Sequence, residues 1–255
     1  MHHTISGAVA VALASFISAV EGHGFVNGAR VNGVWTAGSD PLWWYAQQNN
    51  QPLPVTAGWR ALNQDIGFVE PANMGTSDIA CHKSAKTNTG FINVDAGSTI
   101  TLFWNTWPEG HKGPIINYLA PYNTDFASAA AGSLSFTKIG QGALITGGSN
   151  SKWVTDTMLA SNFSTPVTIP AKLKPGNYVL RHEIIALHAA GSDNGAQMYP
   201  QCLNLKVSGN GTVSLPTGVP ATQLYKRSDP GIIFNLYQDI KSYPIPGPSL
   251  WTGAN

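Results

Sequence analysis

The chain alternates hydrophobic and polar residues over several short segments, and this period of two is typical of β-strands with one buried face. The strand-like segments lie at 98–104, 133–139, 177–186, 203–207 and 232–237. No coiled-coil heptad, internal repeat or low-complexity linker accompanies them in the sequence. The pattern therefore predicts an all-β domain built as a sandwich of antiparallel sheets.

Two stretches, 31–71 and 242–255, show little strand pattern and contain many aromatic residues and prolines. The first holds four tryptophans, and the second holds Tyr243 and Trp251. Long loops on a rigid β scaffold are common places for binding sites. We therefore expect substrate-binding or ligand-binding residues in these stretches.

The N-terminal segment differs in kind from the remainder of the chain. An apolar run diluted with Ala, Ser and Gly ends at Val20-Glu21-Gly22, which resembles a cleavage site. We predict a secretory signal peptide over 1–22 and a secreted, extracellular protein over 23–255, with a cut after Ala19 as the alternative. A membrane anchor is disfavoured, because the run is short for a bilayer about 30 Å thick and lacks a basic flank.

The composition fits a single domain and argues against several kinds of partner. With 43% hydrophobic and 11% charged residues, the 255-residue chain is suited to one well-filled core. Its 14 Lys and Arg against 13 Asp and Glu give a formal charge of +1, so no basic stripe for nucleic acid or an anionic membrane is present in the sequence. We expect a monomer with one catalytic or binding domain over 23–255 and no appended carbohydrate-binding module.

Export changes the interpretation of the two cysteines, Cys81 and Cys202. In an oxidising compartment we expect them to form a disulfide that closes a long loop, whereas in the cytosol two buried free thiols would be the better expectation. Sequons at Asn162 and Asn210 agree with secretion and are candidate glycosylation sites.

A histidine at the start of the mature chain would be a candidate metal ligand. Cleavage after Gly22 leaves His23 with a free α-amine and a ring Nδ1, which together can chelate one ion. The amine has an ordinary pKa of about 7.7 to 8.0, so an ion that binds it at neutral pH must displace a proton. Copper(II) stands highest in the divalent affinity order and prefers a tetragonal set of nitrogen and oxygen ligands.

Two further segments carry residues that can complete such a site. His111 lies on a Gly-rich loop from which it could point at a metal, although a solvated loop histidine is the alternative. Gln197 and Tyr199 are two residues apart and share one face if the segment is extended, and His188 could join them across a turn. The alternative for these three residues is a structural role in a core strand.

Several motifs occur in a specific order along essentially the whole mature chain. They are His-Gly-Phe-Val from 23, Asp-Ile-Ala-Cys-His from 78, Trp-Pro-Glu-Gly-His-Lys-Gly-Pro from 107, Tyr-Leu-Ala from 118, Leu-Arg-His-Glu-Ile-Ile-Ala-Leu-His from 180, Gly-Ala-Gln-Met-Tyr-Pro-Gln-Cys from 195 and Tyr-Pro-Ile-Pro-Gly-Pro from 243. In these motifs the chain resembles the fungal lytic polysaccharide monooxygenases of auxiliary activity family 9, formerly glycoside hydrolase family 61.

The resemblance implies an immunoglobulin-like or fibronectin-III-like β-sandwich whose long loops form a flat substrate face, with one copper ion per chain. By position in the motifs, His23 would supply the amine and Nδ1, His111 would supply Nε2, and Tyr199 would take the axial position of a histidine brace. His188 and Gln197 would lie around the metal and orient the oxygen co-substrate. With Tyr199 they are the candidate catalytic residues.

The activity implied by the resemblance is oxidative cleavage of cellulose or related β-glucans at C1, C4 or both. It uses O₂ or H₂O₂ and an external electron donor, such as a small-molecule reductant or cellobiose dehydrogenase. Two alternatives remain: a noncatalytic secreted protein that binds copper or carbohydrate on the same scaffold, and a glycoside hydrolase with two catalytic carboxylates. Oxidised products would distinguish the monooxygenase from both.

The chain departs from the family pattern in two places. The family often has a second disulfide after the Tyr-Leu-Ala motif, but here no cysteine follows it. The stretch 31–71 also matches no substrate loop residue by residue. Tyr243, in contrast, matches the tyrosine of the C-terminal loop and is the candidate residue for stacking on substrate, with packing inside a Pro-rich loop as the alternative.

Overall fold

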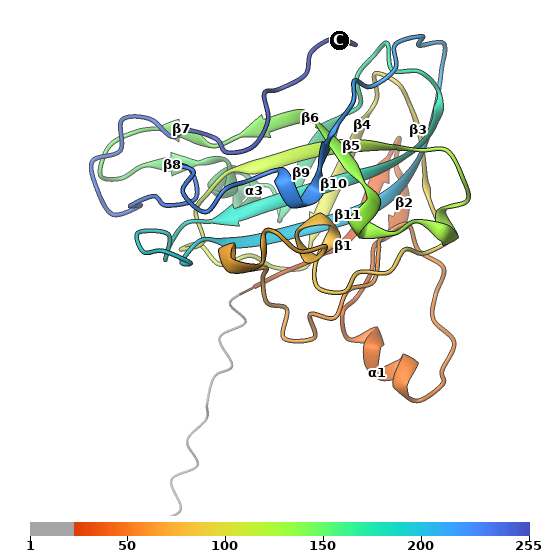
Figure 1. Ribbon diagram of the computed structural model, residues 1–255, viewed down its shortest axis with the longest axis horizontal. Helices are drawn as coiled ribbons and strands as arrows, with labels where there is room; N and C mark the ends of the chain where they lie inside the picture. The colour runs from red at the N-terminus through yellow and green to blue at the C-terminus, as the bar shows by residue number, and fades with distance from the viewer. Residues whose placement is uncertain (1–22) are drawn as a thin grey trace, which may run out of the picture.

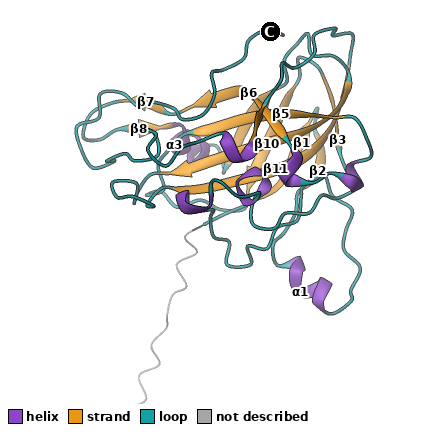
Figure 2. Cartoon of the chain, in the orientation of Figure 1, coloured by secondary structure: helices purple, strands orange, loops and turns teal. Residues whose placement is uncertain are grey.

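A computed structural model describes residues 23–255, so the predicted signal peptide, 1–22, lies outside the described residues. Two β-sheets form a sandwich, with short helices at its margins (Figures 1 and 2). The four-stranded sheet has the order β2 (Val34–Ala37), β1 (Val26–Val31), β4 (Thr99–Trp104), β9 (Ser164–Thr168). The six-stranded sheet has the order β12 (Val219–Pro220), β6 (Ser135–Gly142), β5 (Ile115–Tyr122), β10 (Gly176–Ala186), β11 (Gln197–Ser208), β3 (Ile92–Asp95). The β-sandwich prediction is confirmed.

Short elements complete the part of the chain that the structure describes. A small hairpin pairs β7 (Leu144–Thr146) with β8 (Lys152–Trp153), and the α-helices are α1 (Trp43–Gln48), α2 (Asp78–Cys81) and α3 (Val154–Ala160). Single 3₁₀ turns lie at Pro71–Asn73, Phe126–Ser128, Ala131–Ser133 and Ala221–Gln223. Within 23–255 no helix has the length and apolar character needed to cross a membrane.

Four of the five expected strand segments correspond to β4, β6, β10 and β11, but the fifth prediction is wrong. Residues 232–237 form no strand, because the N–H groups of Ile232 and Ile233 both donate to the Asp229 carbonyl in a turn. The apparent alternation there arises because Ile232 is buried while Ile233 stays 42% exposed. The stretch 31–71 contains two elements that the sequence pattern did not indicate, the edge strand β2 and the helix α1.

The sheets are also not wholly antiparallel. β3 pairs with β11 in parallel, with Leu205 opposite Ile92 and Val207 opposite Val94. The remaining named strand pairs are antiparallel, including the eleven-residue ladder between β10 and β11. The expectation of antiparallel sheets therefore needs this one correction at the edge of the larger sheet.

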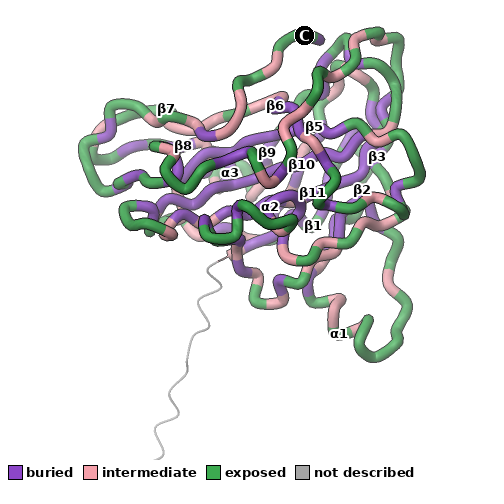
Figure 3. Tube along the Cα trace, in the orientation of Figure 1, coloured by how far each residue is buried: buried purple, intermediate pink, exposed green. Residues whose placement is uncertain are grey.

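Strand β10 is the centre of the molecule and is buried on both of its faces (Figure 3). Leu180 and Ile184 face the four-stranded sheet, in a core that also contains Ile100 and Leu102 of β4. On the opposite face a second core forms beneath α2 and the C-terminal loops. A strand covered on both faces can carry a continuous apolar run, since neither face meets water.

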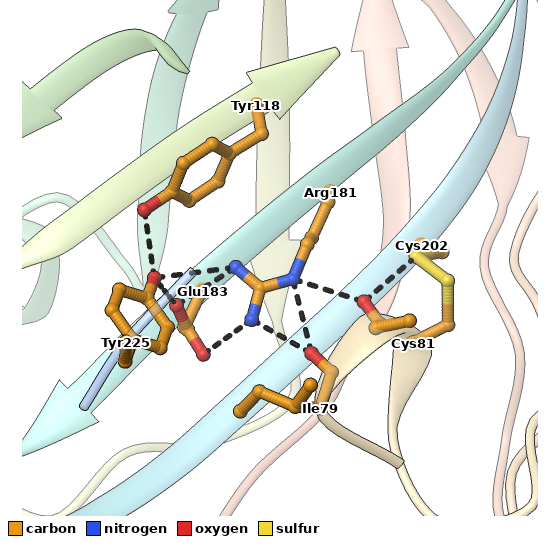
Figure 4. Close-up of polar contacts among 8 residues, drawn as sticks. Ile79, Cys81, Tyr118, Arg181, Glu183, Cys202 and Tyr225 are labelled. Atoms are coloured by element: carbon orange, nitrogen blue, oxygen red, sulfur yellow. Dashed lines mark hydrogen bonds and ion pairs between the residues drawn. A yellow bond between two sulfur atoms is a disulfide. The ribbon is translucent and has the colours of Figure 1, made fainter. Parts of the chain in front are cut away.

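The second core encloses an ion pair within β10, whose arginine also donates hydrogen bonds to α2 (Figure 4). The Arg181 guanidinium donates to both Glu183 carboxylate oxygens at 2.7 and 2.8 Å and to the Ile79 carbonyl at 2.8 Å. Tyr225 donates to Glu183, and Arg181 and Glu183 are both fully buried. Breaking such a pair would leave an uncompensated charge in the core, so β10 and α2 are held firmly together.

The predicted disulfide is confirmed, and it lies beside this ion pair. Cys81 at the end of α2 bonds to Cys202 on β11, with 5.1 Å between the Cα atoms and 121 residues between them in sequence. Closing a loop of that length stabilises the fold by about 4 to 5 kcal/mol in the chain-entropy account. The bond attaches α2 to the same strand that begins at Gln197.

Candidate metal centre

His23 lies immediately before β1 and is held against the turn that follows β4. The Phe25 N–H donates to Asn105 Oδ1 at 2.8 Å, and the Asn105 N–H donates back to the Phe25 carbonyl at 3.0 Å. Gly24 lies so near this turn that an added Cβ would be 2.1 Å from the Thr106 carbonyl oxygen. Only glycine fits at this close approach, which explains the His-Gly pair of the first motif.

The loop that carries His111 is docked on the end of β10. Its turn is closed by the His111 N–H, which donates to the Pro108 carbonyl at 3.0 Å, and by Trp107 Nε1–H, which donates to the His111 carbonyl at 3.0 Å. At Gly113 an added Cβ would lie 1.9 Å from the Ile185 carbonyl oxygen, so a larger residue would push the loop away. Gly113 thus allows close packing of the loop on β10, whereas Gly110 on the other side of His111 borders open space.

Gln197 and Tyr199 lie at the start of β11, where it pairs with the end of β10. The Tyr199 hydroxyl donates to Gln197 Oε1 at 2.7 Å. Since both side chains project from the same face of an extended strand, the prediction about their relative orientation is confirmed. His188 follows β10 by two residues and comes to the same end of the sandwich.

The structure brings the five predicted residues together. The ring centroid of His23 lies 5.6 Å from that of His111 and 5.7 Å from that of Tyr199. His111 and His188 are closer still, with 3.8 Å between ring centroids. We call this group of His23, His111, His188, Gln197 and Tyr199 the metal end.

Burial keeps the histidines of the metal end neutral. It lowers the pKa of His111 to about 4, and the positive charge that His188 or His23 would carry when protonated acts in the same direction. Burial also lowers the pKa of His23, which Asp65 and a hydrogen bond with Gln197 partly offset, and it lowers the pKa of His188. Neutral imidazoles have a lone pair for a metal, so no proton on the ring needs to be displaced near pH 7.

Tyr199 is fully buried at the base of the metal end. Burial raises the pKa of its phenol, and the negative charge of Asp65 adds to the effect. The side chain therefore stays protonated, and a neutral phenol is a weak ligand that can accompany stronger nitrogen donors.

The donor set fits a metal only if it includes the N-terminal amine. Across residues 23–255, no cluster of three or more His, Cys, Asp or Glu side chains has the spacing of a metal site. Two neutral imidazoles, from His23 and His111, face each other here, and the amine of a chain beginning at His23 would add the third nitrogen. His188 Nδ1 is buried without a hydrogen-bond partner in the described residues, and this leaves it available to a small ligand.

Two aromatic residues of the site were not assigned a role from the sequence. Phe68 lies with its ring centroid 5.7 Å from His23 and 5.9 Å from Tyr199, and Trp107 lies 4.9 Å from Tyr199. Trp107 belongs to the same motif as His111, so the motif itself was a signal. Nothing in the local sequence around Phe68 pointed to the metal end, because the contact depends on how the 65–69 loop folds back.

Tyr243 packs inward in the structure. Its ring meets Trp153 and Phe234 edge to face, with centroids 5.0 and 4.9 Å apart, and its hydroxyl donates to the Gly231 carbonyl at 2.6 Å. This is the packing that the sequence left open as the alternative to stacking on substrate. Tyr237, on the same C-terminal segment, is 77% exposed instead.

The α1 segment, residues 40–62, presents more aromatic surface. Figure 1 shows α1 on a loop that extends away from both sheets, and the helix has no buried residue. A small cavity of about 50 Å³ lies between α1 and the chain at 60–62, with Trp43 and Trp44 in its wall. Arg60, also in the wall, has a buried Nε–H without a hydrogen-bond partner in the described chain.

Fold and site together define a β-sandwich protein with a candidate metal centre of two histidines at one end. The chain belongs to Auxiliary Activity family 9 (formerly GH61), whose family model matches residues 23–243. The family membership expected from the motifs is thus confirmed.

Named relatives and solved structures agree with this assignment. Over 249 residues the chain is 51% identical to AA9 family lytic polysaccharide monooxygenase F of Malbranchea cinnamomea, with 98% of each chain covered. It is 50% identical over 241 residues to AA9 family lytic polysaccharide monooxygenase F of Emericella nidulans, covering 92% and 93% of the two chains.

Among solved structures it resembles Cel61B of Hypocrea jecorina, with a TM-score of 0.85, 41% identity and coverage of 90% of this chain and 100% of that one. It also resembles the extended catalytic domain of H. jecorina LPMO9A, with a TM-score of 0.84, 43% identity and coverage of 91% and 92%. The protein is therefore an enzyme of the lytic polysaccharide monooxygenase type, which cleaves polysaccharides oxidatively.

Proposed function

We propose that this protein is a secreted, copper-dependent monooxygenase that cleaves the glycosidic bonds of cellulose or a related β-glucan at C1, C4 or both. One observation carries the proposal: two neutral imidazoles, of His23 and His111, converge beside a buried, protonated Tyr199. Two side chains alone make a weak site, and a mature N-terminus at His23 supplies the further nitrogen.

Copper is the metal that this donor set favours. Nitrogen donors suit copper, which stands above the other divalent first-row ions in affinity. His23 would bind through its amine and Nδ1, His111 through Nε2, and Tyr199 would be a weak additional ligand. When bound, copper supplies the one-electron chemistry that activates O₂ or H₂O₂ with electrons from an external donor, a small reductant or cellobiose dehydrogenase.

The remaining polar groups orient the co-substrate. Gln197 Oε1 is engaged by the Tyr199 hydroxyl, so the amide NH₂ remains free to donate. His188 lies against His111 with an unpartnered Nδ1. We assign both residues to hydrogen bonding of the oxygen co-substrate, a role that favours charge development during the reaction.

Exposed aromatic side chains near the metal end and on the α1 segment are the best candidates for contact with polysaccharide. Tyr237 is 77% exposed and follows Phe234, whose N–H donates to Ala190 beside His188. Tyr45 of α1 is 55% exposed. An aromatic face can stack on the apolar face of a sugar ring while the ring hydroxyls stay hydrated. These residues replace Tyr243 as the expected stacking surface.

The decisive experiment is product analysis on cellulose. Mature protein loaded with one copper ion and supplied with ascorbate and O₂ should release oxidised oligosaccharides, identified by mass spectrometry. A matched sample of His111→Ala should release none. Hydrolysed products without a reductant requirement would favour a carboxylate hydrolase, and tight copper binding without oxidised products would favour a noncatalytic binder.

The mature N-terminus has its own test. Intact mass of the secreted protein should correspond to a chain that begins at His23, because the amine is needed as a ligand. A chain beginning at Val20 would remove the brace and would contradict the proposed metal site.

A further inference from the structure

His82 is a buried histidine in a backbone conformation that side chains seldom adopt. It caps α2 directly after Cys81, with φ of 83° and ψ of 175°, and only 1% of its surface is exposed. That region of φ and ψ is essentially reserved for glycine, so a histidine there persists only if surrounding contacts hold it. Strained residues of this kind cluster at functional sites.

Both ring nitrogens of His82 are used. The Lys83 N–H donates to His82 Nδ1 at 2.9 Å, so Nδ1 carries the lone pair and Nε2 carries the proton. Nε2–H therefore donates to the Gly67 carbonyl, 3.0 Å away and fifteen residues earlier in the chain. Burial lowers the pKa of His82 to about 4, so this neutral tautomer holds near neutral pH.

The Gly67 carbonyl belongs to a loop that carries Phe68 to the metal end. On the far side of Phe68, the Val69 N–H donates to the Met198 carbonyl at 2.8 Å and the Met198 N–H donates back at 3.1 Å. Phe68 is therefore fixed on both sides, by His82 through Gly67 and by β11 through Val69. Ile66 in the same loop also has a positive φ, 53°, which is unusual because its side chain is β-branched.

Phe68 is the aromatic wall of His23. Its ring centroid lies 5.7 Å from that of His23 and 5.9 Å from that of Tyr199, so it contacts two of the proposed ligands and ligates nothing itself. The ring of His23 is partly exposed, and the packing of Phe68 limits how far that ring can rotate.

We propose that His82 is a positioning residue: its Nε2–H bond to the Gly67 carbonyl holds Phe68 against His23 and thereby fixes the orientation of the His23 imidazole. The expected effect on copper binding rests on the proposed function. The position of the His23 ring rests only on the hydrogen bonds and packing described above. Groups that orient a ligand in this way typically change metal affinity or activity 10- to 100-fold when they are lost.

A pair of substitutions separates positioning from a local structural role. His82→Gln keeps an N–H donor at the reach of Nε2, whereas His82→Asn keeps only an acceptor at the place of Nδ1. Asparagine also tolerates positive φ better than glutamine does. A purely local role would thus favour the Asn variant, while the proposal requires that the Gln variant behave like the parent.

Three readouts apply to each variant: ring-proton chemical shifts of His23 by NMR in the metal-free protein, the copper(II) EPR spectrum, and copper affinity by calorimetry. For His82→Asn we expect a shifted His23 ring, altered copper hyperfine coupling and 10- to 100-fold weaker copper binding. For His82→Gln we expect parental values. Parental values for the Asn variant, or equal losses in both folded variants, would overturn the proposal.

Phe68→Leu provides an independent route should either His82 variant fail to fold. It removes the wall without touching His82, so the NMR and EPR changes expected for His82→Asn should appear here too. Unchanged spectra in Phe68→Leu would overturn the proposal. The metal-free NMR measurement also separates this proposal from the proposed function. If the parent protein showed no copper-dependent activity, the proposed function would fail, but the effect of His82 on the position of the His23 ring could still be measured.

Discussion

The metal end and the α1 segment are both rich in aromatic residues, yet they rest on different supports. The metal end is built on the paired ends of β10 and β11, with Tyr199 fully buried and its hydroxyl bonded to Gln197. The α1 segment carries its aromatic side chains on a six-residue helix, Trp43–Gln48, that has no buried residue. The difference matches the two proposed tasks: ligands of a metal must be held in fixed positions, whereas stacking on a polymer tolerates movement.

Loss of a proposed ligand should have the largest effect. His111→Ala should reduce oxidised-product release to background, because the proposed site would lose one of its two imidazole ligands. The melting temperature of the metal-free variant should stay close to that of the parent, since His111 is partly exposed. Product release at the parental rate would remove His111 from the metal site.

The support beneath the metal end should fail next. Glu183→Ala leaves the Arg181 charge buried and unpaired, and we expect a loss of about 3 to 5 kcal/mol in the free energy of unfolding. Asp193→Ala is the matched control, because it breaks an exposed pair with Arg227 and should cost less than about 1 kcal/mol. Equal losses in denaturant melts would mean that the buried pair is not a special support.

Acid should lower the stability of the whole fold through its buried histidines. His82 and His182 are fully buried, and burial lowers their pKa values to about 4 and about 3. The unfolded chain takes up these protons near pH 6.5 and the folded chain does not, so stability should fall as pH drops from 6.5 toward 5. Each histidine contributes on the order of 1 to 2 kcal/mol over that interval.

The measurement is chemical denaturation of the metal-free protein at several pH values above the carboxylate range. His182 accepts from Trp104 Nε1–H, so its removal would disturb the core, and His82→Gln is the better probe. In this variant the free energy of unfolding should depend less steeply on pH, by the equivalent of about one bound proton. An unchanged slope would mean that His82 is protonated in the folded state.

A residue beside the metal should affect rate more than binding. Gln197→Ala should lower turnover about 10- to 100-fold while copper remains bound, because the substitution removes the amide proposed to act on the co-substrate and leaves the proposed nitrogen ligands untouched. Calorimetric copper titration and oligosaccharide release should be measured on the same preparation. Loss of copper binding would make Gln197 a ligand or a prop for one, and unchanged turnover would exclude a role in the reaction.

The smallest effect is expected in the α1 segment. Tyr45→Ala should change the free energy of unfolding by less than about 0.5 kcal/mol, since the side chain is 55% exposed. Binding to cellulose should weaken a few-fold in a pull-down isotherm. The rate at which the copper-loaded protein oxidises a soluble reductant should not change. A large loss of stability would show that α1 is part of the rigid body, and the contrast between the two regions would then be wrong.

The sequence by itself determined what depends on local pattern or on residue identity. Hydrophobic patterning located β4 and β10, the two cysteines could pair only with each other, and the ordered motifs named the residues that meet at the metal end. These signals survive without coordinates, because a strand's period and a ligand's chemistry are properties of the residues themselves.

Only the tertiary structure decided which residues surround that chemistry. Phe68 reaches His23 through a loop held by His82, Tyr243 turns inward onto Trp153, and β3 joins its sheet in parallel. Each outcome depends on contacts between segments far apart in sequence, where burial and hydrogen bonding outweigh local preference. A one-dimensional pattern contains no record of those contacts, so the wall of the site and the exposed aromatic surface emerge only when the chain is folded.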